Sequence, residues 1–577
     1  MEYLIGAVII VIVFFTGGIY LQKKAEKQLE EKIKKSFGLV PEIEFTHEKY
    51  ESIGYYFRKM RERKPEDENH TVIDDITWHD LDMDRVYLTM CATQCSIGEE
   101  YLYYLVRTPV LNNEDLEKRE KLIQFFLKNE NLRIRIQKAL AKAGHISKVS
   151  VYEYLSRLDS LENEGNLKHI LCMVLMAVSI GSVFVAPVLG IMAIFAVFFY
   201  NVITYFKRKS DIENYYSVVA YILRTIEVGD EICAVESDVL KPYTDELKEQ
   251  LKLFKNVTRG SSLIVSKKSN GDILEVALDY FRMATHIDLI RFNIMLARLK
   301  DKKEEFDKIF EIIGILDSMS AVASYRKLMG RWCVPELRHS EYLDSHENGS
   351  SSKKDMGIGI STESVYHPMI IDPVKNTFIE NGNVLLTGSN ASGKSTFIKT
   401  IAINSILAQS INTVMADSYK ASFFKCITSM ALNDNLSDGE SYYIVEIKSL
   451  KRICDSLNGK VPLLIFIDEV LRGTNTLERI AASSRILSYI GERNCMLFAA
   501  THDIELTYIL EKRFSQYHFE EKVEEDGVNF DYKLKKGRAL TRNAILLLKM
   551  LGFREEITQD AENAADDFLK TGEWKEY

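Results

Sequence analysis

The chain is poor in the two residues that most often form turns: its 577 residues include only 29 glycines and 9 prolines. An all-β protein needs many turns, so this scarcity argues against an all-β fold and favours long helices. A basic excess is also missing, because 83 aspartates and glutamates outnumber 74 lysines and arginines and leave a formal net charge of −9. Proteins dedicated to coating nucleic acid are usually basic, so any contact with DNA must come from a local patch.

Cysteine is sparse and scattered as well. Of the eight cysteines, only Cys91 and Cys95 are close in sequence, and no second pair completes a zinc site. This pattern excludes a disulfide scaffold and is typical of a reduced chain in the cytosol. What the chain does have is ordinary hydrophobicity, at 46%, and 10% aromatic residues. It is therefore a folded protein, and its length suggests about four domains.

The N-terminus carries a long apolar run, LIGAVIIVIVFFTGGIYL, from Leu4 to Leu21. About 18 apolar residues suffice to cross the hydrocarbon core of a bilayer. Lys23, Lys24 and Lys27 follow the run, whereas a signal peptide carries its positive charge before it. Residues 1–21 are therefore predicted to be an uncleaved transmembrane anchor, with the following juxtamembrane segment, residues 22–75, in the cytoplasm.

A second apolar stretch runs without a charge from Ile170 to Phe206. It is too long for one span and about right for two short ones, with the turn between Gly181 and Gly190. Basic residues flank both ends, namely Lys168, Lys207, Arg208 and Lys209. Residues 169–206 are thus predicted to form a transmembrane hairpin, which gives three spans in a multi-pass protein of the cell membrane with its soluble parts in the cytoplasm. The alternative is a buried helical hairpin of a soluble protein.

Between these runs the soluble segments are of two kinds. Residues 76–168 and 207–345 repeat apolar residues at spacings of three and four, which predicts helices. After a polar linker, residues 346–357, strands and helices alternate through residues 358–577. The juxtamembrane segment also holds a basic cluster, Arg58, Lys59, Arg61, Arg63 and Lys64. Two interpretations stay open for this cluster: a solvated face that is attracted to anionic lipid, or a contact with DNA phosphates.

A phosphate-binding loop is the strongest motif of the chain. The apolar strand from Asn383 to Thr387 leads into a G-x-x-x-x-G-K-S sequence, and a helical pattern follows. Backbone N–H groups of such a loop face the phosphates of a nucleotide, here ATP, and the helix N-terminus adds a partial positive charge. Lys394 is expected to reach the β- and γ-phosphates, and the Ser395 hydroxyl to coordinate Mg²⁺. The predicted ATP-binding residues of the loop are Gly388, Ser389, Asn390, Ala391, Ser392, Gly393, Lys394, Ser395 and Thr396.

Two further strands end in residues suited to ATP hydrolysis. The first, Leu463 to Ile467, is followed by Asp468 and Glu469. Its continuous hydrophobicity is typical of a central parallel strand, whose C-terminal end lies beside the phosphate loop. Asp468 is predicted to hold Mg²⁺ and Glu469 to polarise the attacking water. The second strand, Cys495 to Ala500, precedes His502, which is predicted to sense the γ-phosphate.

The sequence LSDGESYYIVEI, from Leu436 to Ile447, lies between these motifs and could donate hydrogen bonds to an anion or form a turn before a helix. Together, TGSNASGKSTFIKT, DGESYYIVEI, IDEVLRGTNTLE and FAATHDIEL resemble, in order and spacing, the motifs of the MutS family of ABC-type ATPases. The resemblance implies that Phe378 lies against adenine and that Ser441 touches the γ-phosphate bound by a partner subunit, hence a homodimer. KKGRALTRNAILLLKMLGF resembles the family's closing helix–turn–helix, which helps to hold the dimer.

The resemblance implies an α/β P-loop ATPase domain of the ABC type, preceded by an all-α helical domain like the MutS core, and therefore ATP-dependent clamping of double-stranded DNA in mismatch repair or recombination. Three features depart from the family. The segment before the helical core is too short for a mismatch-reading domain, a membrane hairpin interrupts that core, and the residue before Arg472 is Leu471 rather than glycine. An ATPase that remodels a membrane or a protein partner without DNA is the alternative.

Overall fold

The computed structural model describes residues 20–574 except for a set of short gaps. These gaps are residues 22, 43–45, 147–148, 159–164, 259–272, 340–357, 390–391, 431–441, 472–473, 525–526, 540–544, 546–547 and 550. The predicted N-terminal anchor and the linker at 346–357 therefore lie almost wholly outside the described residues.

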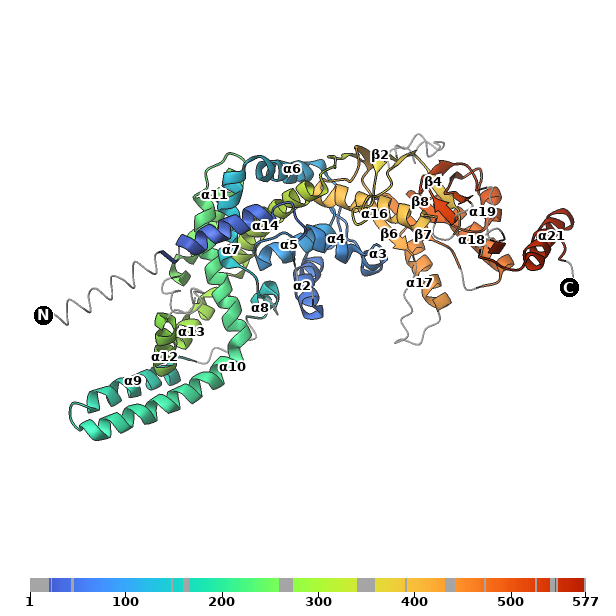
Figure 1. Ribbon diagram of the computed structural model, residues 1–577. Coiled ribbons are helices and arrows are strands. Elements are labelled where there is room, and N and C mark those ends of the chain that lie inside the picture. The colour runs from blue at the N-terminus through green and yellow to red at the C-terminus, as the bar shows by residue number, and fades with distance from the viewer. Residues whose placement is uncertain are drawn as a thin grey trace. The chain divides into compact units, whose positions relative to one another are not determined.

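The chain divides into two compact units, each discontinuous in sequence (Figure 1). The helical unit comprises Met1–Pro65, Leu88–Leu105 and Lys118–Leu328. The α/β unit comprises Glu66–Tyr87, Val106–Glu117 and Met329–Tyr577. Linear boundaries near 75 and 357 do not reproduce this division. The third segment of the α/β unit begins at Met329, shortly before β1 (Glu336–Arg338), which pairs with β5 (Ser418–Ser422) of the smaller sheet.

Helices make up the helical unit, as the three- and four-residue spacing predicts. One helix of its core is α14 (Lys303–Met329), which has 27 residues and a row of buried side chains from Phe306 to Arg326. Besides the hairpin helices described below, this part of the chain forms α2 (His47–Arg63), α4 (Met83–Met90), α5 (Ser96–Arg107), α6 (Asn113–Lys128), α7 (Glu130–Ala143), α8 (Val151–Ser156), α11 (Lys241–Thr258), α12 (Ile273–Thr285) and α13 (Ile287–Lys300). Helices α4, α5 and α6 each begin in one unit and end in the other, so the chain crosses between the units within helices.

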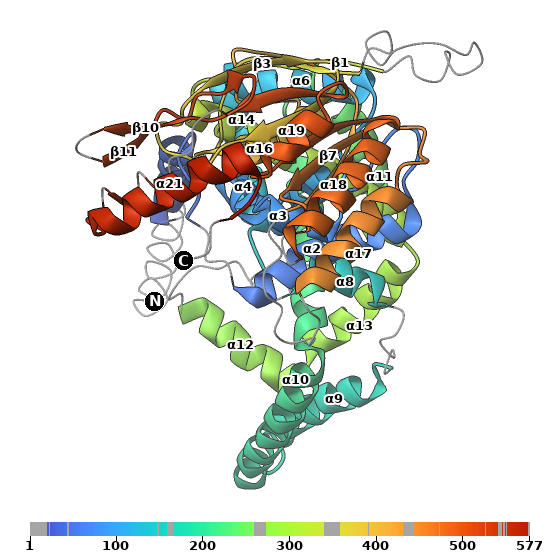
Figure 2. The same ribbon diagram turned by 90° about the vertical axis from the view of Figure 1, so that its right-hand side faces the viewer.

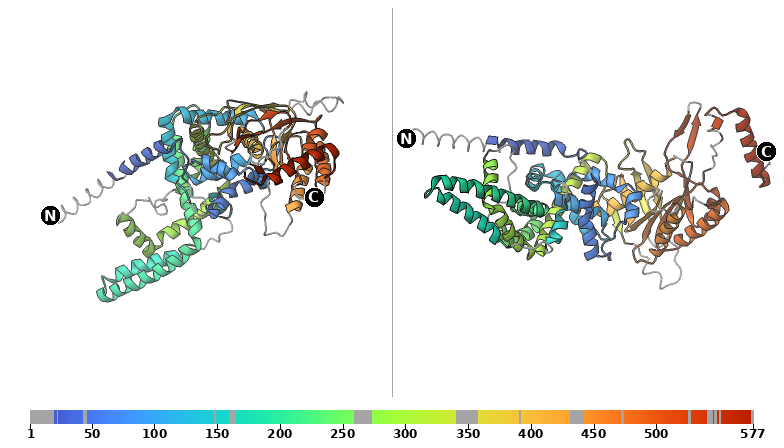
Figure 3. Two further views of the ribbon diagram at one scale, coloured as in Figure 1. Left: turned by 45° about the vertical axis from the view of Figure 1, so that its right-hand side comes forward. Right: turned by 90° about the horizontal axis from the view of Figure 1, so that it is seen from below.

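The uncharged stretch forms a helical hairpin of α9 (Leu167–Ser182) and α10 (Pro187–Cys233), which lie side by side in Figure 3. Pro187 opens α10, where its missing N–H is not needed. Among the described residues, α10 alone is long and apolar enough to cross a membrane, whereas α9 has only 16 residues. Three transmembrane helices are therefore not supported. The reason is that α9 stops short of a full span and that the first predicted span lies outside the described residues.

The basic cluster of α2 is largely paired with carboxylates of the same unit. Arg63 Nη1 lies 2.9 Å from Asp307, and Lys59 Nζ lies 2.6 Å from Glu62. Arg58 makes a longer contact of 3.4 Å with Glu51. These pairs neutralise most of the charge that a DNA phosphate would otherwise meet.

A six-stranded mixed sheet forms the centre of the α/β unit, in the order β12-β9-β4-β8-β7-β6. All neighbours are parallel except β12, which runs antiparallel to β9. The strands are β4 (Asn383–Thr387), β6 (Lys425–Ser429), β7 (Leu463–Asp468), β8 (Cys495–Ala500), β9 (Phe514–His518) and β12 (Lys535–Lys536). β7 and β8 are buried along their apolar lengths, as expected for parallel strands covered on both faces.

Helices lie on both faces of this sheet (Figure 2), and alternate residues of β7 pack toward one layer or the other. Leu463, Ile465 and Ile467 pack in one core with residues of α17 (Tyr442–Asp455), α18 (Thr476–Gly491) and α19 (Ile504–Ile509). Phe466 points the other way, with its ring centroid 5.0 Å from that of Phe498. The helix α16 (Lys394–Ile411) covers this second face, where its Phe397 joins the aromatic cluster.

A smaller sheet and a terminal helix complete the α/β unit. The sheet has the order β1-β5-β2-β3, with β2 (Ile360–Val365) and β3 (Asn376–Glu380) antiparallel to each other. A two-stranded ribbon, β10 (Glu521–Glu524) and β11 (Gly527–Phe530), follows β9. The last described helix is α21 (Glu555–Thr571). Of the predicted helix–turn–helix before it, residues 540–544, 546–547 and 550 lie outside the described residues.

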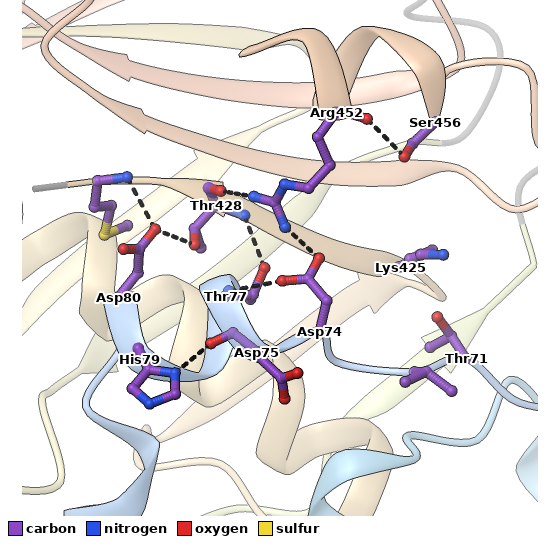
Figure 4. A network of polar contacts seen from close by, with 12 residues as sticks. Thr71, Asp74, Asp75, Thr77, His79, Asp80, Lys425, Thr428, Arg452 and Ser456 are labelled. Atoms are coloured by element: carbon purple, nitrogen blue, oxygen red, sulfur yellow. Dashed lines mark hydrogen bonds and ion pairs between the residues drawn. The ribbon is translucent and has the colours of Figure 1, made fainter. Parts of the chain in front are cut away.

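Residues 66–87 cover the free edge of β6, although they precede it by about 350 positions (Figure 4). In α3 (Asp75–Asp80), Asp80 accepts hydrogen bonds from the Thr428 hydroxyl at 2.6 Å and from Met430 N–H at 2.9 Å. Thr77 Oγ1 accepts the Thr428 N–H at 3.2 Å. An unpaired strand edge invites aggregation, and these contacts satisfy it from within the chain.

Candidate nucleotide-binding site

The loop between β4 and α16 begins and ends at glycines in conformations that other residues rarely adopt. Gly388 has φ 144° and Gly393 has φ 109°. A Cβ atom at Gly388 would lie 2.8 Å from the Phe519 carbonyl oxygen and 2.9 Å from Ser392 Oγ, which is too close for any side chain. The tight curl of the loop therefore depends on glycine at this position.

Lys394 closes the loop from inside. Lys394 is only 4% exposed, and its Nζ donates hydrogen bonds to the carbonyl oxygens of Gly388 and Ser389, at 2.8 Å each. The Ser389 hydroxyl donates in turn to Glu521 of β10. An ammonium held at the centre of a curled backbone, at the N-terminus of an 18-residue helix, forms a site for a polyanion. Asn390 and Ala391 lie outside the described residues.

Asp468 stands at the end of β7 with an unsatisfied oxygen. Its Oδ1 is buried and has no hydrogen-bond partner among the described groups. A buried carboxylate oxygen normally has a partner, so an orphan here is the kind of group that a cation or its bound water satisfies. Together with the Ser395 hydroxyl at the start of α16, the donor set is all oxygen and fits Mg²⁺.

Glu469 and His502 are in direct contact. His502 Nε2 lies 2.8 Å from Glu469 Oε1, and the Glu469 side chain is 16% exposed. Glu469 also lines the same cavity as Lys394 and Ser395. The adjacent Asp503 accepts two hydrogen bonds from Arg479 of α18, at 2.7 and 3.0 Å, which fixes the corner that carries His502. The two strand ends thus bring a carboxylate and an imidazole together beside the loop.

The turn after β7 is strained and supported by a residue that the motifs did not single out. Glu469 has φ 58° and Leu471 has φ 60°, both in the left-handed region that favours glycine. The Leu471 N–H donates to Glu446 Oε1, and Glu446, on α17, is 5% exposed. Strained backbone of this kind gathers at functional sites and persists only where its surroundings hold it. Glu446 lies within the Leu436–Ile447 segment that the sequence singled out, but its role could not be predicted there, because its partner Leu471 is 25 positions away in another element.

A cavity of about 580 Å³ opens beside the loop and includes an apolar wall. The wall is formed by Ile370, Ile371 and Val374, of which Ile371 is 91% exposed. Phe378 does not line this cavity. It is 1% exposed, with its ring centroid 5.4 Å from that of Phe498, so its predicted place against adenine stays a prediction that its burial does not favour. The sequence offered one indication of this wall: two neighbouring isoleucines, Ile370 and Ile371, stand just before Pro373 in a loop, where large apolar residues are unusual.

His367 forms a further part of the cavity lining. Burial, followed by the positive charges of Lys399 and Arg85, lowers the pKa of His367 to about 4. Its Nδ1 accepts the Met369 N–H at 3.2 Å. His367 is therefore a neutral side chain at physiological pH, and the cationic charge that the cavity offers to phosphates comes from Lys394.

The described residues thus bring Lys394, Ser395, Asp468, Glu469 and His502 to one edge of the sheet. Ser441 and the rest of residues 431–441 lie outside the described residues, so the predicted contact with a partner's ATP is not placed. Arg472 and Gly473, which follow the strained turn, are likewise outside them.

Residues 384–569 match the family described as MutS domain V. The chain is 28% identical to the DNA mismatch repair protein MutS of Aquifex pyrophilus over 293 residues, which cover 48% of this chain and 32% of that protein. It is 30% identical to the DNA mismatch repair protein MutS of Leptospira interrogans over 313 residues, or 51% of this chain and 34% of that protein. It is 30% identical to the DNA mismatch repair protein MutS of Natronomonas pharaonis over 216 residues, which cover 35% of this chain and 25% of that protein. The chain thus spans about a third or less of these relatives.

Proposed function

Because the chain belongs to the MutS family, through residues 384–569 as its MutS domain V, we propose that it is a membrane-anchored ATPase that acts as a homodimer on double-stranded DNA. ATP binding closes two nucleotide sites on each other, and hydrolysis reopens them. The helical unit converts this cycle into clamping of DNA in mismatch repair or recombination. The observation that carries the ATPase assignment is the contact between Glu469 and His502 beside a cavity that also holds Lys394.

The residues of the site have separate tasks. N–H groups of loop 388–393 and the start of α16 hold the phosphates, and Lys394 exchanges its two carbonyl partners for phosphate oxygens. Mg²⁺, when held by Ser395 and Asp468, neutralises charge on the β- and γ-phosphates. Glu469 orients the attacking water and accepts its proton, and His502 fixes the Glu469 carboxylate and reports the γ-phosphate. The apolar wall at Ile370, Ile371 and Val374 is suited to the nucleobase.

The dimer completes each site in this proposal. Ser441 immediately precedes α17, and the resemblance to MutS assigns it to the γ-phosphate bound by the partner. A site finished only by a second subunit makes hydrolysis conditional on closure, because the donors must meet the phosphate where charge develops.

Membrane anchoring rests on the hairpin α9–α10 and on the apolar run at residues 4–21. Large apolar side chains of the hairpin are exposed, such as Phe184 at 89% and Phe195 at 61%. Basic residues at 23–24, 168 and 207–209 then lie on the cytoplasmic side. Cysteine labelling in intact cells tests this topology: a cysteine placed near residue 150 or 350 must stay unlabelled by an impermeant reagent.

Measurements of the affinity for DNA test the proposed clamping. The detergent-solubilised dimer is titrated with a DNA duplex, with and without ATP, across a salt series. Clamping predicts ATP-dependent binding that weakens as salt rises, because phosphate contacts release counterions. Glu469→Gln should prolong the ATP-dependent complex, whereas Lys394→Ala should abolish its ATP dependence. Equal binding with and without ATP would contradict a clamp driven by the nucleotide.

The second candidate is an ATPase that remodels a membrane or a protein partner without DNA. Two observations favour it: the ion pairs that neutralise α2, and the single helix α10 that joins the apolar hairpin to the core of the helical unit. This function predicts no measurable affinity for DNA at physiological salt and an ATPase rate that depends on bilayer composition.

A further inference from the structure

Helix α12 exposes apolar side chains on more than one side. Val276 and Tyr280, four residues apart, are 56% and 58% exposed, and Leu278 and Phe281, three apart, are 42% and 50% exposed. Residues at these spacings form two separate stripes of a helix. A helix that is apolar on several sides normally lies inside a protein core or in a membrane. The part of the chain that the structure describes leaves these four side chains exposed, so the apolar environment they require must come from elsewhere.

The C-terminal end of α12 is fastened to the hairpin by buried hydrogen bonds. Asn201 of α10 is fully buried, and its Nδ2 donates to the Ala284 carbonyl oxygen at 2.7 Å. His286, which follows α12, places its Nε2 2.8 Å from the Asn201 carbonyl oxygen and its Nδ1 3.0 Å from that of His169 on α9. Figure 2 shows one end of α12 beside α10 and the other end lying away from it.

The attachment point lies well inside the apolar length of the hairpin. Asn201 follows Pro187 by 14 positions, which is about 21 Å along α10, and precedes Lys207 by about 9 Å. The hydrocarbon core of a bilayer is about 30 Å thick. If the turn at residues 183–186 reaches the far side, Asn201 and the end of α12 lie within the near leaflet.

We propose that α12 is a lipid-facing helix immersed in the cytoplasmic leaflet beside the hairpin, with the acyl chains of the bilayer as its ligand. At 13 residues it is about 20 Å long and does not span. Tyr280 suits the membrane interface, where aromatic rings with a polar tip gather. The charged residues of this turn are internally paired, because Arg282 Nη1 lies 2.8 Å from Asp279. The inference rests on the membrane insertion of the hairpin proposed above.

Tryptophan fluorescence with brominated lipids tests this directly. The full chain carries Tyr280→Trp, Phe281→Trp or Val276→Trp one at a time, in vesicles whose lipids bear bromine either near the glycerol end or near the methyl end of the acyl chains. The signal of the three native tryptophans, measured in the parent protein, is subtracted. Phe195→Trp on the hairpin is the positive control. Leu253→Trp is the matched negative control, because Leu253 is 45% exposed on α11 between Lys252 and Lys255.

Lipid contact predicts at least a twofold loss of the added fluorescence for each α12 variant, and no loss for Leu253→Trp. If Phe195→Trp is quenched while all three α12 variants behave as Leu253→Trp does, α12 is not in lipid and the inference alone is overturned. If Phe195→Trp is also unquenched, the hairpin is outside the bilayer, and the proposed anchoring fails together with the inference.

Discussion

The carboxylate of Asp80 lies 2.6 Å from the hydroxyl of Thr428, across the free edge of the six-stranded sheet. The same oxygen accepts the N–H of Met430, the last described residue before the segment 431–441. A short helix from the N-terminal third of the chain thus holds the point at which β6 leads into the sequence that carries Ser441. Arg452 of α17 reinforces this contact with hydrogen bonds to Asp74 and to the Thr428 carbonyl oxygen.

Asp80→Ala should destabilise the α/β unit by about 1–3 kcal/mol, because it leaves the Thr428 hydroxyl and the Met430 N–H buried without an acceptor. Thermal or denaturant unfolding measures the loss, and hydrogen exchange should increase at residues 425–430. Glu68→Ala is the matched control, because its 2.8 Å pair with Lys460 is exposed and contributes about 0–1 kcal/mol. Equal effects of the two changes would mean that the buried contacts are not what stabilises this edge.

Glu469→Gln should retain ATP affinity and lower turnover by about 10²–10⁴, because an amide cannot accept the proton of the attacking water. Lys394→Ala should abolish ATP binding. Both are measured by equilibrium binding and by phosphate release. Glu505→Gln, an exposed carboxylate on the nearby helix α19, serves as the control and should leave both quantities unchanged. If Glu469→Gln hydrolyses ATP at the rate of the parent protein, a residue other than Glu469 must orient the attacking water.

Glu446→Ala should lower turnover while leaving the dissociation constant of ATP within about threefold. Glu446 touches the backbone of Leu471 rather than the nucleotide cavity, so it acts by holding the strained turn that carries Glu469. Glu446→Gln, which keeps an acceptor oxygen, should restore most of the rate. Asp455→Asn on the same helix removes only a surface pair with Lys451 and is the control. A rise in the dissociation constant with turnover unchanged would contradict a positioning role.

Mixed dimers test the shared site. Ser441→Ala subunits keep their own phosphate loop, and Lys394→Ala subunits keep Ser441. Each variant alone should be nearly inactive, because one lost donor costs about 10²–10³ in rate. Mixing them creates dimers with one doubly defective and one intact site, so activity should recover to about half of the parent per mixed dimer. Full activity of Ser441→Ala alone would show that Ser441 does not complete the partner's site, and the alternative interpretation of residues 436–441 as a simple turn would then hold.

The stability of the helical unit should fall as pH rises from about 5 to 8. Burial raises the pKa of Glu100 from 4.5 to about 8, although Ser150 and the Val151 N–H donate to it. A raised carboxyl pKa contributes stability that is fully present below about 4.5 and is lost as pH rises through about 8.

Glu100→Gln removes this titration, so its unfolding midpoint should change less than that of the parent over the same range. The difference should correspond to a few kcal/mol, because each pKa unit is worth about 1.4 kcal/mol. Glu130→Gln, an exposed carboxyl on α7, should follow the parent. A Glu100→Gln profile parallel to that of the parent would show that Glu100 is charged in the folded protein.

The sequence predicted those parts of the site that are contiguous. In each case an apolar run is followed by a polar motif in the sequence. The structure has these strands at the predicted positions: β4 before the glycine loop, β7 ending at Asp468 and β8 preceding His502. The hairpin turn was predicted between Gly181 and Gly190, and the helices break at residues 183–186.

The rest depends on contacts between distant residues. Nothing near Asp80 in sequence indicates a strand edge 350 positions away, and the helical pattern of residues 76–168 gave no sign that α3 joins the α/β unit. The burial of Phe378 depends on Phe397 and Phe498, and the role of Glu446 on a turn in another element. The charges at 207–209 also concealed that α10 continues as one helix to Cys233.

That continuity has a mechanical consequence. A 47-residue helix is about 70 Å long along its path, and Figure 1 shows that α10 curves between the apolar hairpin and the helical core while it stays one helix to Cys233. A single unbroken helix thus links the apolar segment to buried residues such as Ile222 and Ile232, so a displacement of one end is passed to the other. Coupling between two sites is reciprocal. If, as proposed, the hairpin lies in a membrane and closure of the nucleotide sites tilts α10, a thicker or stiffer bilayer that resists the tilt must weaken ATP binding by the same free energy, so that the affinity for ATP would vary with the thickness of the bilayer.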